Sequence, residues 1–319
     1  MSVQAPSVKR KPRGLPALFQ IQNVRRFVQA AFALFILYTA IVLRIVGEGG
    51  AVAAASPEAY CPFGGFETLY KLITSGGKFV SHTHLSNLVL FGGVLLISVA
   101  FRGAFCGWIC PLGAIQEWLY GTSAWIQKRV PFVGDAVKNL KRVVNPKPLP
   151  RAGQTAQPTL AQRSDRWLRY FRYVVLAWIV WGTITYGVMV FRDVDPWAAL
   201  LGILTGELAV GLGLAALILL VVAGLFVERA WCRYACPLGA IVGLVGKISP
   251  VRIQREGSAC SGCRICSKKC PVGIDVASVQ DVTDSNCNMC LQCVDTCPKP
   301  GALELRLVLP GVPMIGEKQ

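Results

Sequence analysis

The chain has 319 residues, of which 53% are hydrophobic and 16% are charged. Soluble domains average about 25% charged residues, so this composition argues against a soluble enzyme and favours a membrane protein. The formal net charge of +16 could indicate nucleic-acid binding, but the sequence has no groove-reading helix and no platform of basic and aromatic residues. We therefore expect no nucleic-acid partner. Thirteen cysteines in a chain of this length also argue against the disulfide framework of short secreted proteins.

Four apolar runs are long enough to cross the ~30 Å hydrocarbon core of a bilayer as helices, which takes roughly 17–25 residues. They cover residues 27–46, 85–101, 173–191 and 208–227. The first run has no convincing cleavage site and is expected to remain as an anchor. The sequence thus predicts an α-helical integral membrane protein with four transmembrane helices. The membrane domain covers residues 27–249 and follows a basic N-terminal segment, residues 1–26.

The distribution of Lys and Arg predicts the orientation, because these residues favour the cytoplasmic side of a membrane. Residues 1–26 contain six basic and no acidic residues, and residues 102–172 contain twelve basic and three acidic residues. The other two connections, residues 47–84 and 192–207, contain more acidic than basic residues. We expect a multi-pass protein of the bacterial cytoplasmic (inner) membrane with both termini cytoplasmic. Residues 145–162 are expected to form a flexible cytoplasmic linker.

The membrane domain is predicted to consist of two parallel repeats that meet on an axis along the membrane normal. In each repeat an outer loop precedes a membrane helix, and a C-x3-C-P motif follows that helix. The loops contain Cys61-Pro62 and Asp195-Pro196, and each is expected to form a short helix with Pro at its first position and Gly at its end. Asp195 is expected to cap its helix, and Cys61 to be a cap or a packed thiol.

The two C-x3-C-P motifs supply Cys106 and Cys110 in one repeat, and Cys232 and Cys236 in the other. They are expected where the second and fourth membrane helices reach the cytoplasm, and the proline after each pair starts a new helix. Three interpretations stay open. The four thiols bind one further metal or iron–sulfur centre, or each pair is a redox-active dithiol, or the reduced cysteines pack helix ends.

Residues 250–308 are the candidate soluble domain, and residues 309–319 form a tail. Two runs with the spacing C-x2-C-x2-C-x3-C-P begin at Cys260 and Cys287. In bacterial two-cluster ferredoxins the fourth cysteine of such a run binds the other cluster. We therefore predict two [4Fe–4S] clusters in a small α+β ferredoxin-like domain, one on Cys260, Cys263, Cys266 and Cys297 and one on Cys287, Cys290, Cys293 and Cys270. Zinc is disfavoured, because its sites usually take two separated cysteine pairs. The flanking apolar segments, near residues 251–254 and 303–307, are expected to pair as a hairpin.

The outer side of the membrane domain carries the two histidines of the chain, His82 and His84. A quinol that is oxidised needs a proton acceptor, and His titrates near neutral pH. His82, His84 and Glu67 are therefore the candidate quinol and proton site, with Tyr60 and Tyr70 as further candidates. The alternative is that these polar residues anchor helix ends at the interface.

The combination of four membrane helices, two C-x3-C-P motifs and a C-terminal two-cluster ferredoxin resembles the NapH/NosR-type membrane polyferredoxin family, over residues 27–307. The short, four-helix form is most similar to the NapH-type quinol dehydrogenase component. The resemblance implies an electron-transfer oxidoreductase subunit with quinone or quinol as substrate. Its partner would be a redox protein, such as a ferredoxin-like protein, a cytochrome or a reductase subunit. The alternatives are a CcoG-like cupric reductase for cofactor assembly and a redox-sensing membrane scaffold.

Overall fold

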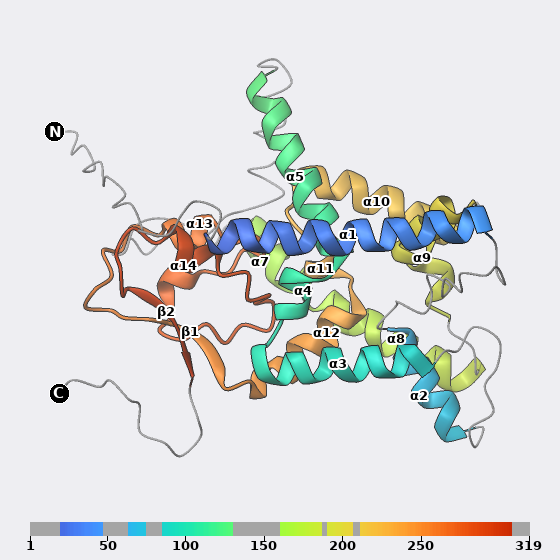
Figure 1. The fold of residues 1–319 in the computed structure, drawn as a ribbon. Helices are drawn as coiled ribbons and strands as arrows, with labels where there is room; N and C mark the ends of the chain where they lie inside the picture. The colour runs from blue at the N-terminus through green and yellow to red at the C-terminus, as the bar shows by residue number, and fades with distance from the viewer. Residues whose placement is uncertain are drawn as a thin grey trace.

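The computed structural model describes residues 20–46, 63–74, 85–129, 160–186, 190–206 and 211–307. The helices of the described part follow one another in the same order in two halves of the chain (Figure 1). The first half contains α1 (Ile21–Val46), α2 (Gly64–Thr74), α3 (Leu85–Phe101), α4 (Ala104–Trp108) and α5 (Pro111–Arg129). The second contains α8 (Phe171–Tyr186), α9 (Pro196–Thr205), α10 (Leu212–Phe226), α11 (Ala230–Tyr234) and α12 (Pro237–Val245), and α7 (Leu160–Leu168) precedes it.

Each half ends in the same local structure, a five-residue helix between an arginine and a cysteine-proline pair. Arg102 and Arg229 precede α4 and α11 with φ of 56° and 55°, a region that residues other than glycine rarely adopt. Pro111 and Pro237 then begin α5 and α12, because proline lacks the N–H that an interior helical position needs but a first position does not. The predicted helices after the two prolines are therefore confirmed.

Within the described residues, α1 is the one helix both long and apolar enough to cross a membrane, with a mean hydropathy of 2.0 over Ile21–Ile45. The helices α3, α8 and α10 have 17, 16 and 15 residues and lie in the other three predicted spans. Four membrane crossings therefore stay a prediction. In the described residues, α8 already begins at Phe171, Phe191 lies in a turn, and α7 begins at Leu160 inside the predicted linker.

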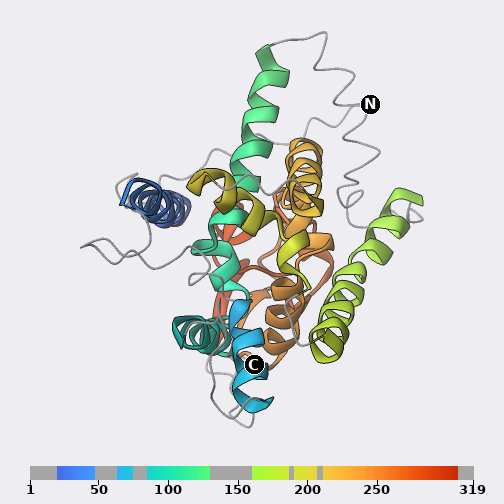
Figure 2. The same ribbon diagram turned by 90° about the vertical axis from the view of Figure 1, so that its right-hand side faces the viewer.

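The loop helices α2 and α9 lie at the end of the molecule opposite the ferredoxin-like part (Figure 1). Asp195 caps α9, because its Oδ1 accepts a hydrogen bond of 3.0 Å from the N–H of Trp197, and Gly206 ends the helix with φ of 98°. Both ends of α9 were predicted correctly. Gly65 of α2 lies against Asn87 and Phe91 of α3, so α2 packs along the first turns of α3. In Figure 2, α1 in blue and α3 in teal are seen nearly end-on, with α2 beside α3.

Residues 251–307 form a small module at the other end of the helices (Figure 1). Strands β1 (Val251–Arg255) and β2 (Leu303–Leu307) pair antiparallel, with Val251 opposite Leu307, so the expected hairpin is confirmed. Between them lie only short helices, α13 (Ile265–Lys268) and α14 (Gln292–Thr296), and the turn Val276–Ser278. The apolar core is correspondingly small and contains cysteines among its buried side chains: Val251, Ile253, Cys266, Val272, Ile274, Val276, Val282, Met289, Cys293 and Leu303.

Candidate metal centres

A cavity in the ferredoxin-like module is lined by the four cysteines that the sequence predicts to bind one cluster, Cys270, Cys287, Cys290 and Cys293. Its remaining walls are largely apolar and include Ile253, Val276 and Val282. The fourth cysteine of the first run thus lies with the first three of the second run, although seventeen positions separate Cys270 from Cys287. Four convergent thiols and an otherwise apolar lining are the donor set and surroundings that a [4Fe–4S] cluster takes.

The buried thiols of this cavity need metal cations, such as the iron ions of a cluster, before they can ionise to thiolates. Burial raises the pKa of Cys270 to about 12 and that of Cys287 to about 11, and the negative charge of Cys290 contributes to both rises. Thiols in this environment stay protonated unless a metal stabilises the thiolates, since the thiolate is the form that binds iron. The Ile274 N–H donates a 3.3 Å hydrogen bond to Cys270 Sγ, and such bonds tune the potentials of iron–sulfur clusters.

The other predicted ligand set lies at the far side of the module. Burial raises the pKa of Cys266, and nearby Cys297 and Cys263 raise it further, so the crossed pattern of ligands recurs here. Cys263 is exposed, whereas Cys290, its equivalent in the second run, is buried. One candidate cluster site therefore faces away from the helices and the other lies close to them.

The two C-x3-C-P motifs contact each other across the boundary between the repeats. Arg229, at the start of α11, donates a 2.7 Å hydrogen bond from Nη1 to the carbonyl of Cys106 in α4. Gln116, in α5, donates from Nε2 to Cys232 Sγ at 3.3 Å, and its Oε1 accepts from the N–H of Trp231 at 2.9 Å. Arg229 and Gln116 are both fully buried. Each motif is therefore held by a side chain from the opposite repeat.

Three buried arginines surround the Cys287–Cys290 segment, and they are functional candidates that the sequence analysis missed. Arg102 lowers the pKa of Cys287, and Arg25 and Arg229 lower that of Cys290, in each case against the larger effect of burial. All three are at most 4% exposed, and each has guanidinium nitrogens without a hydrogen-bond partner among the described residues. Buried cations with unused donors next to cysteines fit an anionic cluster.

Glu117 supplies the counter-charge for two of these arginines. Its Oε1 accepts from Arg229 Nε at 2.8 Å, and its Oε2 accepts from Arg25 Nη2. Because α1, α5 and the start of α11 each contribute one of these residues, the ion-paired group joins both repeats. In the sequence, the three arginines count only toward the cytoplasmic positive charge, so no local pattern distinguished them.

The helix α4 lies directly on the segment that carries Cys287 and Cys290. Trp108 Nε1 donates a 3.0 Å hydrogen bond to the carbonyl of Met289, and Gln22 of α1 donates a 2.8 Å bond to the carbonyl of Cys290. A Cβ at Gly107 would lie 2.1 Å from the Asn288 carbonyl oxygen, and one at Gly103 would lie 2.5 Å from that of Cys287. Only glycine permits this approach, so the first C-x3-C-P motif and the second ferredoxin run form one continuous site.

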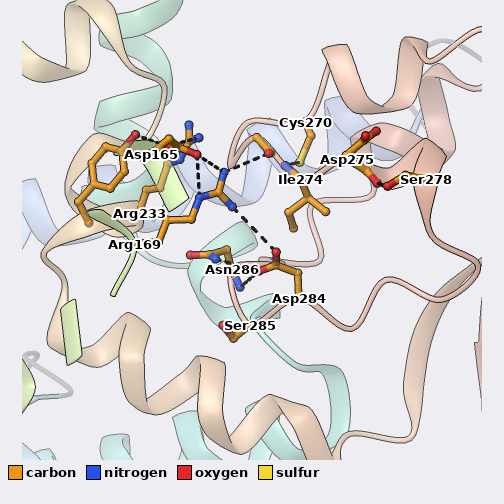
Figure 3. A network of polar contacts seen from close by, with 12 residues as sticks. Asp165, Arg169, Arg233, Cys270, Ile274, Asp275, Ser278, Asp284, Ser285 and Asn286 are labelled. Atoms are coloured by element: carbon orange, nitrogen blue, oxygen red, sulfur yellow. Dashed lines mark hydrogen bonds and ion pairs between the residues drawn. The ribbon is translucent and has the colours of Figure 1, made fainter. Parts of the chain in front are cut away.

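A second contact, made by charged residues, holds the module to the other repeat (Figure 3). Asp165 pairs with Arg233, which lies inside the second motif, at 2.6 Å and with Arg169 at 2.8 Å. Arg169 also donates to the carbonyl of Gly273 at 3.1 Å and lies 3.9 Å from Asp284, both in the module. Burial alone would raise the pKa of Asp165, but the charges of the two arginines outweigh it and the pKa is lowered.

Only part of the candidate quinol site on the predicted outer side lies among the residues that the structure describes. His82, His84, Tyr60 and Cys61 lie outside the described residues. Glu67 lies in α2, and its side chain is also outside the described part. Tyr70, also in α2, donates a 3.3 Å hydrogen bond to the carbonyl of Ile184 in α8, so it joins helices of the two repeats. The proton-accepting role of His82, His84 and Glu67 stays a prediction.

Two protein-family models match segments of the chain. One, described as a 4Fe-4S binding domain, matches residues 83–132 and residues 209–256. The other, described as a 4Fe-4S dicluster domain, matches residues 252–298. The first segment covers α3 to α5 and the second covers α10 to α12, so they match the last three helices of each half, and each contains a single C-x3-C-P pair.

Three curated relatives have names that refer to electron transport or to ferredoxins. YccM of Escherichia coli (strain K12), named as a candidate electron transport protein, is 29% identical over 79% of this chain and 64% of its own length. The ferredoxin-type protein NapH of the same organism is 27% identical over 67% of each chain. The methylamine utilization ferredoxin-type protein MauN of Paracoccus denitrificans is 28% identical over 56% of this chain and 53% of its own. The chain thus matches between about half and two thirds of these relatives. No solved structure matches the chain.

Proposed function

Because the chain belongs to the NapH-type polyferredoxin family, whose relatives support an iron–sulfur electron-transfer role, we propose that it carries electrons between the membrane quinol pool and a partner redox protein. The observation that carries this proposal is the contact between α4 and the Cys287–Cys290 segment. This contact supports the proposal, because the Cys287–Cys290 segment lies against the helices at which a membrane-soluble donor would react. The exposed Cys263 side of the module is left for a soluble partner.

The proposed membrane topology has four crossings, formed by α1, α3, α8 and α10. A helix of 17 residues, such as α3, spans about 26 Å, which is slightly less than the hydrocarbon core and calls for local thinning or extension into the loops. The start of α1 lies with the ferredoxin-like module, because Gln22 bonds to Cys290. With the excess of basic residues in residues 1–26 and 102–172, this supports a cytoplasmic module and an outer side at α2 and α9.

The proposed cofactors of the module are two [4Fe–4S] clusters with the crossed ligand sets, Cys260, Cys263, Cys266 and Cys297, and Cys287, Cys290, Cys293 and Cys270. When bound, such clusters supply one-electron transfer. The chain supplies the thiolates, an apolar cavity wall that excludes water, and the guanidinium groups of Arg25, Arg102 and Arg229. These cations offset the negative charge that a reduced cluster adds in a buried place, which favours reduction.

The experiment that tests quinol as the donor uses the full-length protein, purified without oxygen in detergent. Addition of a menaquinol analogue should bleach the iron–sulfur absorbance, and dithionite serves as the control that the clusters can be reduced. The variant His82→Ala/His84→Ala should slow the bleaching by quinol and leave that by dithionite unchanged. If quinol bleaches nothing, with or without a redox partner present, the proposal is wrong. Reduction of Cu(II), followed with a cuprous chelator in the absence of quinol turnover, would instead favour a metal reductase.

A further inference from the structure

The four C-x3-C-P cysteines lie together, although two come from each repeat. Cys106, Cys110 and Cys236 pack against one apolar cluster, which includes Phe91, Phe105, Ile179 and Leu238 from both repeats. Cys232 joins them through Gln116, which extends from the helix that follows Cys110 and donates to the Cys232 sulfur. The two motifs are therefore not separate structures at two helix ends. They face each other across the boundary of the repeats.

Buried side chains fix this arrangement from both sides. Arg229, three residues before Cys232, donates to the carbonyl of Cys106 at 2.7 Å, and a Cβ at Gly113, in the turn after Cys110, would lie 3.3 Å from Arg229 Nη1. Gln116 accepts from the N–H of Trp231, next to Cys232, at 2.9 Å. Arg229 and Gln116 are both fully buried, so the two motifs are held against each other. Four thiolates gathered in such a place need a bound cation.

The two cysteines that precede proline have the same surroundings in both repeats. The N–H of Gly239 donates to Cys236 Sγ at 3.4 Å, and the N–H groups of Gly113 and Leu112 hydrogen-bond to Cys110 in the corresponding turn. Cys270, the cysteine-proline residue of the first ferredoxin run, accepts an N–H in the same way. Backbone N–H groups aimed at cysteine sulfur stabilise thiolates and are typical of iron–sulfur ligands.

The spacing of the thiols distinguishes a cluster from a single ion. A tetrahedral zinc with Zn–S bonds near 2.3 Å places its sulfurs roughly 3.8 Å apart. Among the described residues, no group of three or more Cys, His, Asp or Glu side chains is placed to hold a single metal ion, so the four thiols are not arranged around one zinc. A redox dithiol within one repeat would not require the two pairs to meet.

We propose that Cys106, Cys110, Cys232 and Cys236 together bind a third [4Fe–4S] cluster at the boundary between the two repeats. A cubane takes four cysteine thiolates and each repeat offers two, so neither repeat could bind it alone. The site lies next to the ferredoxin cluster of Cys290. The helix α4, which begins just before Cys106, lies on the segment between Cys287 and Cys290, because Trp108 donates to the carbonyl of Met289 and Gly107 touches Asn288. The inference of this third cluster does not require quinol to be the electron donor.

The test measures iron and acid-labile sulfide in the full-length protein, purified without oxygen. The wild type should contain about twelve irons per chain, four for each of three clusters. The variants Cys110→Ser and Cys236→Ser should each contain about eight. The double variant should also contain about eight, because either single change removes the same shared cluster. EPR signals of the two ferredoxin clusters should be retained in all three variants, which shows that they have folded.

Two results would overturn the proposal: about eight irons in the wild type, or losses that add up in the double variant, as two independent sites require. If a variant loses its ferredoxin signals and has not folded, alkylation of the wild type decides instead. All four cysteines should resist iodoacetamide in the native protein and become reactive together when iron is chelated. Four thiols that react before chelation would contradict the shared cluster. Either failure would leave the two-cluster electron carrier in place, so it is distinct from a failure of the quinol experiment.

Discussion

The substitution Gly107→Ala tests whether α4 and the second ferredoxin run form one site. The added Cβ would lie 2.1 Å from the carbonyl oxygen of Asn288 and 3.5 Å from the N of Cys290, whereas ordinary contacts begin at 3.4 Å. The segment would have to retreat by roughly 1.3 Å, since a backbone oxygen cannot rotate out of the way. Metal sites tolerate ligand displacements of about 0.2 Å. The change is therefore several times larger than the cluster next to Cys290 can accept.

The matched control is Gly121→Ala in α5, where an added Cβ meets nothing within 4 Å. Alanine is better than glycine in a helix by about 1 kcal/mol, so this variant should be as stable as the wild type or slightly more so. Gly107→Ala has the same propensity gain, but overpacking costs about 1–3 kcal/mol and the contact cannot relax without moving a cluster ligand. We expect Gly107→Ala to lose or shift the EPR signal of the Cys287–Cys290 cluster, while Gly121→Ala keeps it. Identical iron content, EPR spectra and midpoint potentials in the two variants would refute the close contact.

Three further predictions concern the module and its attachment. Asp165→Asn removes the carboxylate that pairs with buried Arg233 and with Arg169, which contacts the module; breaking a buried pair costs about 3–5 kcal/mol, so proteolysis between the module and the helices should become faster. Because the pKa of Asp165 is lowered, its contribution is lost only in acid below about pH 4, so proteolysis of the wild type should stay constant from about pH 8 to 5. Cys263→Ser should remove the outer cluster and about four irons, and quantitative EPR should still detect the cluster next to α4. Chelation of iron should unfold the module, whose apolar core is small, with little change in helical circular dichroism; a module that stays protected from proteases without iron would contradict this.

Local patterns predicted the parts of this molecule that depend on neighbouring residues. Asp195 and Gly206 mark the two ends of α9 because an N-cap and a left-handed glycine act within one turn. The hairpin of residues 251–307 followed from alternation of apolar residues in two short segments. The repeat was readable because the same residue types return in the same order.

The parts that depend on contacts between distant segments were not predictable. Arg102 and Arg229 stand near other basic residues in segments predicted to be cytoplasmic, and nothing next to them in the sequence shows that they are buried beside cysteines. Gly103 and Gly107 read as ordinary small residues, because the carbonyls that require them come from residues 287–288. The predicted span was extended to Phe191 because apolar residues continue past Tyr186, whereas Phe191 lies in a turn and packs against Phe63 in an edge-to-face contact.

The ferredoxin-like module is attached on two sides, by Trp108 in one repeat and by the charged contacts of Arg233 in the other. A module attached in this way cannot swing on a tether. Under the proposed function, an acceptor would therefore have to come to the module and meet the exposed Cys263 and the exposed Lys268 and Lys269 that follow it. Electron delivery on the proposed cytoplasmic side would then be limited by such encounters and their dependence on ionic strength, with no hinge to open.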